Sequence, residues 1–486
     1  MNLVKLVIYN ARRHEQNPAV ASPSGVATYW ALMGAVAAAV RVIGTLGLAP
    51  RALVLLDIRN PVHHIAMLYA LALSGMRSAS VGTAYVTERA GPLPALFLTD
   101  RPNTAPNDVP VRQVQADWFA HDERRPVDYG ALLRMPGFED ADEVFRYMYS
   151  SGTTGRPKCV GLTGRTLAAR AARSAFEMPF QAKAGPTLST MGFSTVLGTL
   201  IPFMTHTNGG LLCLSNGGPM ALQLIRAFGV TYLAGSVAQL QDTVRALRGA
   251  PPPPTLRTIF PAGSAIPRAL LLELRARLAS HVYGMYNSTE MGRITVFEAE
   301  DMGRGAGAVG YVAPSVTLEI VDGDGRPLPQ GQDGAIRVKS PELAVYVGDD
   351  GEVVPATDAD GWFYPGDVGR LELDGMLMIT GRTSEVMNLG GMMVAPEAIE
   401  EVLRLDGRFA DLAVTGVPSP GGTDQVWAAV VSPGPVDEAA VLAAARVRLN
   451  ERTPTRIVVV EKIPRNENGK VMRNALRDEL MRLALN

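Results

Sequence analysis

The chain has 486 residues, of which 47% are hydrophobic and 19% charged, so it can bury a core for one large and one small domain, or about three domain-sized units. Its 46 lysines and arginines against 47 aspartates and glutamates give a net charge of −1, which argues against nucleic-acid binding. The two cysteines, Cys159 and Cys213, argue against a disulfide framework or a zinc site and fit a reducing cytoplasm.

The N-terminal region predicts neither a signal peptide nor a membrane span. A polar run at residues 10–17 occupies the place where a signal peptide needs an apolar segment. The most apolar stretch, residues 29–48, is rich in alanine and carries Arg41, which predicts a buried or amphipathic helix. We therefore expect a cytoplasmic protein with no transmembrane segment.

The next part of the chain alternates strands and helices. Residues 52–58 form an apolar run of strand length, residues 61–76 predict a helix, and residues 95–99 predict another strand. Such alternation predicts a parallel sheet. His63 and His64 fall within this helix, where we interpret them as ordinary helix residues and not as catalytic groups.

A polar segment containing two glycines follows the strand predicted at residues 144–149. Two glycines let backbone N–H groups approach an oxyanion, the hydroxyls add donors, and a lysine adds positive charge. These groups suit a polyphosphate, although the P-loop pattern does not fit them, and a solvated turn is the alternative. The candidate phosphate-binding residues are Ser150, Ser151, Gly152, Thr153, Thr154, Gly155 and Lys158.

The alternation continues after this segment. Helices are predicted at residues 166–178, 221–228, 238–247 and 268–278, and strands at residues 211–215, 231–234 and 257–261.

The pattern Ser-Ser-Gly-Thr-Thr-Gly-x-Pro-Lys at residues 150–158 resembles the phosphate loop of the AMP-forming adenylating enzymes. This superfamily contains acyl-CoA synthetases, adenylation domains of nonribosomal peptide synthetases and beetle luciferases. The resemblance covers nearly the whole chain and implies an α/β fold. Its large N-terminal domain, residues 1–381, would have parallel and mixed sheets flanked by helices and a β-rich subdomain. A hinge at residues 382–385 would precede a small mobile α+β domain at residues 386–486.

Residues 283–290, Tyr-Gly-Met-Tyr-Asn-Ser-Thr-Glu, resemble a nucleotide-binding motif of this superfamily. The resemblance implies that Tyr286 lies against the adenine, that Thr289 contacts the α-phosphate and that Glu290 holds Mg²⁺. Such a role suits Mg²⁺, which binds one or two carboxylates together with phosphate oxygens. Asn287 stands where glycine is usual, and we expect a turn there because asparagine tolerates positive φ.

The resemblance also implies an acyl pocket. Phe193 falls where the superfamily places an aromatic residue at the pocket mouth, and a core phenylalanine is the alternative. Small residues at 261–265 resemble the loop between nucleotide and acyl group, where they allow close backbone approach. Peptide-synthetase domains for α-amino acids carry an aspartate in this tract, whereas residues 193–195 read Phe-Ser-Thr, so the resemblance implies an acid without a free α-amine. The candidate pocket residues are Phe193, Gly263, Ser264 and Gly284.

The C-terminal third carries the remaining motifs after a strand-rich stretch from about residue 310 to 377. The resemblance implies that Asp367 and Arg382 contact the ribose and that Ser384 is the pivot of the hinge. It also implies that Gly390 and Gly391 face the tunnel for the thiol. The sequence pattern of the last hundred residues predicts a compact α+β unit.

Near the end, residues 464–473 resemble the loop Pro-Arg-x-x-x-Gly-Lys-x-x-Arg. The resemblance implies that Lys470 bridges the substrate carboxylate and the α-phosphate. Taken alone, a Gly-Lys pair in a polar loop is typical of a solvated turn.

The motifs together predict an enzyme that uses ATP and Mg²⁺ to convert a small carboxylic acid into an acyl-adenylate, with CoA as the acyl acceptor. An AMP-forming acyl-CoA synthetase is the leading hypothesis. The alternative is a stand-alone adenylation enzyme that passes the acyl group to a carrier-protein thiol or to an amine. A third possibility is a weakly active relative that binds a nucleotide or acyl ligand, and the intact Lys158, Glu290 and Lys470 argue against it.

Overall fold

The computed structural model describes most of the chain. The described residues are 3–81, 90–101, 108–122, 124–150, 158–177, 185–263, 266–301, 307–383, 385, 387–389, 393–394, 396–405, 407–419, 424–465 and 471–484. Contacts divide the chain into two compact units: the first is Met1–Ala299, Ala313–Val316 and Lys339–Gly361, and the second is Glu300–Val312, Thr317–Val338 and Trp362–Asn486. The division into a large domain, a hinge and a mobile domain stays a prediction.

The first sheet of unit 1 has the described strand order β19-β18-β8-β7-β4-β3-β5-β6. Strand β3 pairs in parallel with β4 and β5, which confirms the parallel sheet predicted from the alternation. Strands β7 and β8 form an antiparallel hairpin that places Ser150 opposite Lys158. The bounds are β3 Leu53–Asp57, β4 Arg77–Ser80, β5 Leu96–Thr99, β6 Val111–Gln113, β7 Val144–Ser150, β8 Lys158–Thr163, β18 Val345–Val347 and β19 Val353–Pro355.

The second sheet of unit 1 has the order β14-β13-β12-β11-β9-β10-β1-β2. It is parallel from β13 to β1, and antiparallel pairs, β13–β14 and β1–β2, flank this parallel part. The bounds are β1 Pro18–Ser22, β2 Gly25–Thr28, β9 Thr187–Ser189, β10 Leu212–Leu214, β11 Tyr232–Ser236, β12 Thr258–Ala262, β13 His281–Ser288 and β14 Gly292–Glu298.

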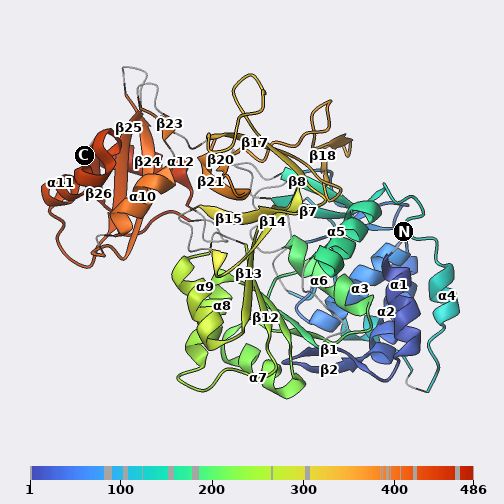
Figure 1. Ribbon diagram of the computed structural model, residues 1–486. Helices are drawn as coiled ribbons and strands as arrows, with labels where there is room; N and C mark the ends of the chain where they lie inside the picture. Colours follow the sequence, from blue (N-terminus) through green and yellow to red (C-terminus); the bar gives the residue numbers. More distant parts are fainter. Residues whose placement is uncertain are drawn as a thin grey trace. The chain divides into compact units, whose positions relative to one another are not determined.

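The helices of unit 1 pack against these sheets. In Figure 1, α1, α2 and α3 (blue) lie together beside α5 and α6 (green), and these helices share contacts. Asn60 caps α3 by accepting hydrogen bonds from the amides of Val62 and His63, as side chains at this position commonly do. The bounds are α1 Leu3–Arg13, α2 Tyr29–Thr45, α3 Pro61–Leu73, α4 Tyr129–Arg134, α5 Gly164–Glu177, α6 Val196–His206, α7 Gly218–Phe228, α8 Val237–Ala246 and α9 Arg268–Arg277.

The main hydrophobic core of unit 1 lies among α2, α3 and α6, where Tyr69, Leu32 and Phe203 are fully or almost fully buried. The hydroxyl of Tyr69 lies 2.8 Å from Nδ1 of His206. The buried hydroxyl therefore has a hydrogen-bond partner in the core. None of the helices in the described part of the chain is long and apolar enough to cross a membrane.

Unit 2 begins with a strand-rich portion, as the sequence predicts. Its described strand order is β16-β17-β20-β21-β15, and the pairs β17–β20, β20–β21 and β15–β21 are antiparallel. The bounds are β15 Ala308–Val312, β16 Thr317–Val321, β17 Gly334–Lys339, β20 Asp367–Leu371 and β21 Met376–Arg382.

The last hundred residues form α+β structure, which confirms the prediction for this part. Strand β25 pairs antiparallel with β24 and parallel with β26, and a short pair, β22–β23, precedes α10. The bounds are β22 Met387–Asn388, β23 Met393–Val394, α10 Pro396–Arg404, β24 Asp411–Pro418, β25 Asp424–Val431, α11 Glu438–Leu449, β26 Arg456–Val459 and α12 Arg473–Ala484.

Candidate active site

Lys158 is the first residue of β8 and lies opposite Ser150, the last residue of β7, at the loop end of the β7–β8 hairpin. Its side chain is exposed, and its Nζ lies 5.2 Å from the centroid of the Tyr346 ring, a distance typical of a cation–π interaction. The predicted phosphate-binding residues Ser151, Gly152, Thr153, Thr154 and Gly155 lie outside the described residues. Register therefore places the two ends of the candidate phosphate loop side by side.

Tyr346 joins two candidate groups that are far apart in the sequence. It lies on β18, which pairs with β8 so that Tyr346 stands opposite Val160. Burial, and then the nearby charge of Glu290, raise the pKa of Tyr346 to about 12. The ring is therefore neutral at physiological pH and lies near both Lys158 and Glu290. Sequence reasoning missed Tyr346, because nothing in the pattern of residues 345–347 distinguishes it from an ordinary strand residue.

Thr289 and Glu290 lie in the turn that connects β13 and β14, and both are half-buried. The amide of Ala344 donates to the carbonyl of Glu290 at 2.8 Å. The guanidinium of Arg170 donates to the carbonyls of Thr289 at 3.0 Å and of Glu290 at 3.3 Å. The backbone of this turn is thus held by two segments distant in the sequence, namely α5 and the residue that precedes β18.

Tyr286 and Asn287 lie on β13, with a register shift between them. The expected turn with positive φ at Asn287 is wrong: β13 continues to Ser288, and Asn287 has no positive φ. The register shift leaves Ile294 of β14 as the extra residue between the partners of Tyr286 and Asn287, so the irregularity lies in the partner strand. Gly284 has a structural role of its own, because a Cβ there would lie 1.9 Å from the ring of Phe297.

The described residues suit Mg²⁺ bound together with a nucleotide. They contain no group of three or more His, Cys, Asp or Glu side chains that could hold a metal. Mg²⁺ commonly needs only one or two carboxylates when phosphates supply the other oxygens. Glu290 offers such a carboxylate from a half-buried turn, and its charge lies near Tyr346, the ring that Lys158 contacts.

Phe193 lies just before α6, and its ring stacks on His64 with centroids 4.2 Å apart and planes 12° apart. Nε2 of His64 lies 2.6 Å from the hydroxyl of Ser80, and its Nδ1 lies 3.1 Å from the carbonyl of Ile58. Burial, and then the charge of Arg146, lower the pKa of His64 to about 3, so the imidazole is neutral. His64 is therefore a buried support for Phe193.

Arg146 holds the backbone of the same segment. Its Nη2 donates to the carbonyl of Phe193 at 3.0 Å and to the hydroxyl of Ser80 at 2.6 Å. Its side chain is fully buried, and this burial lowers its pKa to about 9. Phe193 is thus fixed through both its ring and its carbonyl. Gly263, at the end of β12, has a φ of +92°, a conformation that favours glycine, and Ser264 lies outside the described residues.

Asp367 and Arg382 lie in unit 2 as register partners on β20 and β21. Nε of Arg382 lies 3.0 Å from Oδ1 of Asp367, whose side chain is 7% exposed. The structure therefore brings together the two residues predicted to contact the ribose. The predicted hinge and tunnel residues, Ser384, Gly390 and Gly391, lie outside the described residues.

Lys470 also lies outside the described residues, but both flanks of its segment are described. Arg465 donates to Asp411 at 3.1 and 2.8 Å, and the amide of Met472 donates to the carbonyl of Pro464 at 2.9 Å. Arg465 and Val471 also form an antiparallel bridge. The two flanks of the predicted lysine loop are therefore held together.

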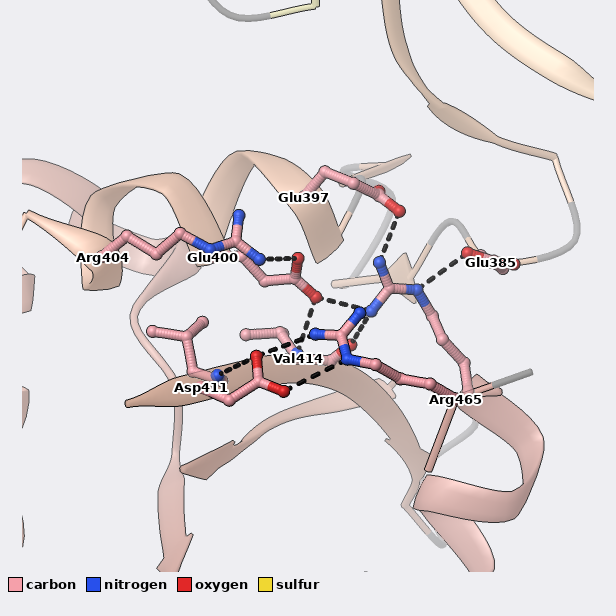
Figure 2. Close-up of polar contacts among 9 residues, drawn as sticks. Glu385, Glu397, Glu400, Arg404, Asp411, Val414 and Arg465 are labelled. Atoms are coloured by element: carbon pink, nitrogen blue, oxygen red, sulfur yellow. Dashed lines mark hydrogen bonds and ion pairs between the residues drawn. The ribbon is translucent and has the colours of Figure 1, made fainter. Parts of the chain in front are cut away.

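Arg473 anchors the second flank. Its Nε donates to Glu385 at 2.8 Å and its Nη1 to Glu400 at 2.6 Å, while its Nη2 bonds Glu397. Figure 2 shows these three carboxylates turned toward one guanidinium group. Burial would lower the pKa of Arg473, but the three carboxylates raise it above its ordinary value. Arg473 thus ties the start of α12 to α10 and to the segment that follows the predicted pivot.

A family model described as AMP-binding enzyme matches residues 8–345. The chain therefore belongs to the family of AMP-binding enzymes.

Known proteins resemble the chain over different lengths. The medium-chain fatty-acid–CoA ligase of Escherichia coli (strain K12) is 27% identical over 354 residues, which cover 70% of this chain and 62% of that ligase. The fatty acid–[acyl-carrier-protein] ligase ScoC of Streptomyces coeruleorubidus is 27% identical over 98% of this chain and 96% of its own.

A solved structure resembles the chain over almost its full length. The o-succinylbenzoate coenzyme A synthetase MenE of Bacillus subtilis, in complex with ATP and a magnesium ion, superposes with a TM-score of 0.82. It is 22% identical, and the match covers 98% of this chain and 99% of that one. This likeness confirms the fold class predicted from the sequence.

Proposed function

We propose that this chain is an AMP-forming acid–thiol ligase that uses ATP and Mg²⁺ to activate a carboxylic acid and transfers the acyl group to CoA. The observation that carries the proposal is that Lys158 lies against the ring of Tyr346 and that the charge of Glu290 lies near the same ring, all within unit 1. A phosphate-binding cation and a metal-binding carboxylate then lie near the same neutral ring. The CoA ligase among the relatives and the synthetase solved with ATP and magnesium support the proposal.

Activation requires the acid to attack the α-phosphate of ATP and release pyrophosphate. The transition state spreads negative charge over phosphoryl oxygens, so positioning and electrostatics supply most of the catalysis. Lys158 and the segment 150–155 would hold the β- and γ-phosphates, and Thr289 and Lys470 would contact the α-phosphate. Mg²⁺ bound with ATP would neutralise phosphate charge, and Glu290 would hold it.

Other residues would hold the nucleoside and the acid. Tyr286 and Asn287 would lie beside the adenine, and Asp367 and Arg382 beside the ribose. The acyl pocket would include Phe193, whose position is fixed by His64 and Arg146. Its further candidate residues are Gly263, Ser264 and Gly284.

Transfer would follow a change of domain arrangement. The C-terminal domain, residues 386–486, would turn about Ser384, withdraw Lys470 and admit a thiol along Gly390 and Gly391. The thiol sulfur would then attack the acyl carbonyl and release AMP. We also propose that the enzyme works in the cytoplasm, where its two free, buried cysteines would stay reduced.

A second candidate acceptor is a carrier-protein thiol, because ScoC resembles the chain over nearly its full length. The deciding experiment measures pyrophosphate release against a panel of fatty, aryl, dicarboxylic and amino acids, each with and without CoA. Acid-dependent release with acyl-CoA and AMP formed only when CoA is present supports the ligase. Acid-dependent release that CoA does not affect points to a carrier protein or an amine. No release with any acid would contradict both.

Replacing Phe193 with alanine is expected to change which acid the enzyme prefers. Burying a phenylalanine side chain contributes about 1.5–3 kcal/mol, so KM for the best acid should rise about 10–100-fold while KM for ATP stays unchanged. Phe119→Ala is the matched control, because Phe119 stacks on the neighbouring His63 at 4.1 Å and 11°. An equal change of acid preference in the control would contradict the pocket role.

A further inference from the structure

Arg170 is a buried arginine of α5 that grips the turn carrying Thr289 and Glu290. Its side chain is fully buried among residues of unit 1. Within the described chain, its hydrogen bonds all end on backbone carbonyls: Thr289 at 3.0 Å, Glu290 at 3.3 Å, and Glu342 at 2.8 and 3.2 Å. A planar guanidinium can reach several acceptors in fixed directions at once. Arg170 therefore sets the position of this turn relative to α5.

A second arginine, Arg173, supports the first from one turn further along α5. Its Nη1 lies 2.8 Å from Oε1 of Glu342, and the two side chains are 8% and 3% exposed. The other oxygen of Glu342 accepts a hydrogen bond from the amide of Arg293 at 2.8 Å. The carboxylate also approaches Gly292 so closely that a Cβ there would lie 2.1 Å from it. Glu342 thus joins α5 to the first residues of β14.

The charges in this network point toward Glu290. Burying a cation costs several kcal/mol unless opposite charge lies nearby. The nearby carboxylates of Glu342 and Glu290 supply this opposite charge for the buried guanidinium of Arg170. The carboxylate of Glu342 is already bonded to Arg173. Glu290 is therefore the second negative charge near Arg170, and it lies at the turn whose backbone Arg170 holds.

The same network connects the metal side of the site with its phosphate side. Strand β8 begins at Lys158 and leads directly into α5, which begins at Gly164 and carries Arg170 and Arg173. Lys158 and Arg170 thus lie on consecutive elements of the chain, and Arg170 contacts the turn that carries Glu290.

We propose that Arg170, supported by the ion pair between Arg173 and Glu342, is a positioning residue that holds Glu290 in place for Mg²⁺ bound with ATP. This inference rests on the proposed function, in which Glu290 holds that ion. Arg170 contacts neither substrate nor metal, and it acts on the backbone of the turn. Sequence reasoning did not identify it, because the basic residues of α5 resemble those of any amphipathic helix.

The test measures the equilibrium affinity for ATP, in the absence of an acid, as a function of Mg²⁺ concentration. In Arg170→Met the apparent affinity for Mg²⁺ is expected to fall about 10–100-fold, as is typical when a residue that orients a metal ligand is removed. The affinity for ATP without Mg²⁺ should be unchanged. Arg170→Lys should recover part of the loss, because lysine keeps the charge but reaches fewer carbonyls.

Three further variants separate the possible explanations. Glu290→Gln should lower the Mg²⁺ affinity by itself, and adding Arg170→Met to it should cause little further loss, since the two residues act as one unit. Arg51→Met is the matched control, because Arg51 forms a partly buried ion pair with Glu143 elsewhere in unit 1, at 2.6 Å. It should lower thermal stability and leave the Mg²⁺ dependence unchanged.

The outcomes are distinguishable. If Glu290→Gln leaves the Mg²⁺ dependence unchanged, the proposed metal role of Glu290 fails, and the role of Arg170 fails with it. The inference about Arg170 alone is overturned if Glu290→Gln lowers the Mg²⁺ affinity but Arg170→Met does not. It is also overturned if the losses of the two single variants add fully in the double variant. If Arg170→Met does not fold, Glu342→Gln tests the same network and should lower the Mg²⁺ affinity in the same direction. No change in that folded variant would also overturn the inference.

Discussion

Replacing Lys470 with alanine is expected to abolish formation of the acyl-adenylate while leaving the second half-reaction largely intact. In the proposed mechanism, Lys470 draws the substrate carboxylate and the α-phosphate together. Removing one preorganised group that stabilises developing negative charge typically costs about 100–1,000-fold in rate. Acid-dependent exchange of pyrophosphate into ATP measures the first step. Thioester formation from a supplied acyl-adenylate measures the second.

The matched control is Lys462→Ala, which removes an exposed lysine a few residues upstream in the same part of unit 2. It should leave both half-reactions unchanged, because its charge is solvated. Equal loss of both half-reactions in Lys470→Ala would contradict the assigned role and would indicate a general disturbance. Retention of full exchange activity would show that another cation serves the first step.

Replacing Arg473 with methionine is expected to be the most destabilising single change in the C-terminal part of the chain. The guanidinium is 9% exposed and bonds three carboxylates, of which Glu400 is 4% exposed. It also donates to the carbonyl of Val414 at 2.7 Å. Removing one partner of a buried ion pair typically costs about 3–5 kcal/mol, because the remaining charge stays buried.

Amide hydrogen exchange measures the loss of stability in Arg473→Met segment by segment. The amides of α10, β24 and α12 should lose protection together. Arg465→Met is the matched control: its pair with Asp411 is more exposed, at 32% and 37%, so about 0–1 kcal/mol is expected. Arg473→Lys should recover only part of the stability, since an ammonium group cannot reach the three carboxylates and the carbonyl together. Equal effects of Arg473→Met and Arg465→Met would contradict this account.

Loss of Arg473 should also impair adenylation, because it anchors the flank of the predicted lysine loop and bonds Glu385, which follows the predicted pivot. We expect this loss even at temperatures where the variant remains folded. A folded variant with full exchange activity would show that the anchor serves stability only.

The sequence predicted most of the elements that support the candidate site. Apolar runs and glycine or proline boundaries identified β3, α3, β7 and α5 within a few residues of their bounds, because these signals are local. The one clear error concerns Asn287. The motif resemblance suggested a turn there, whereas β13 continues through Asn287 without a positive φ, and the register shift lies in the partner strand β14.

Motifs read from the sequence also indicated which family the chain belongs to, and a family model matching residues 8–345 confirms it. Such motifs are recognisable because phosphate binding requires particular residue types at close spacing, such as glycines, hydroxyls and a lysine. The proposed roles of the individual residues follow from these motifs and stay predictions.

Only the tertiary structure decided which distant side chains meet. Tyr346 lies over Lys158 because β18 pairs with β8, and Arg170 reaches Thr289 and Glu290 from α5. No local pattern specifies these contacts, since they depend on the order of strands in a sheet and on which face of a helix is buried. The candidate phosphate- and metal-binding side chains can thus be identified from the sequence. The residues that hold them in position are determined by burial and by long-range strand pairing.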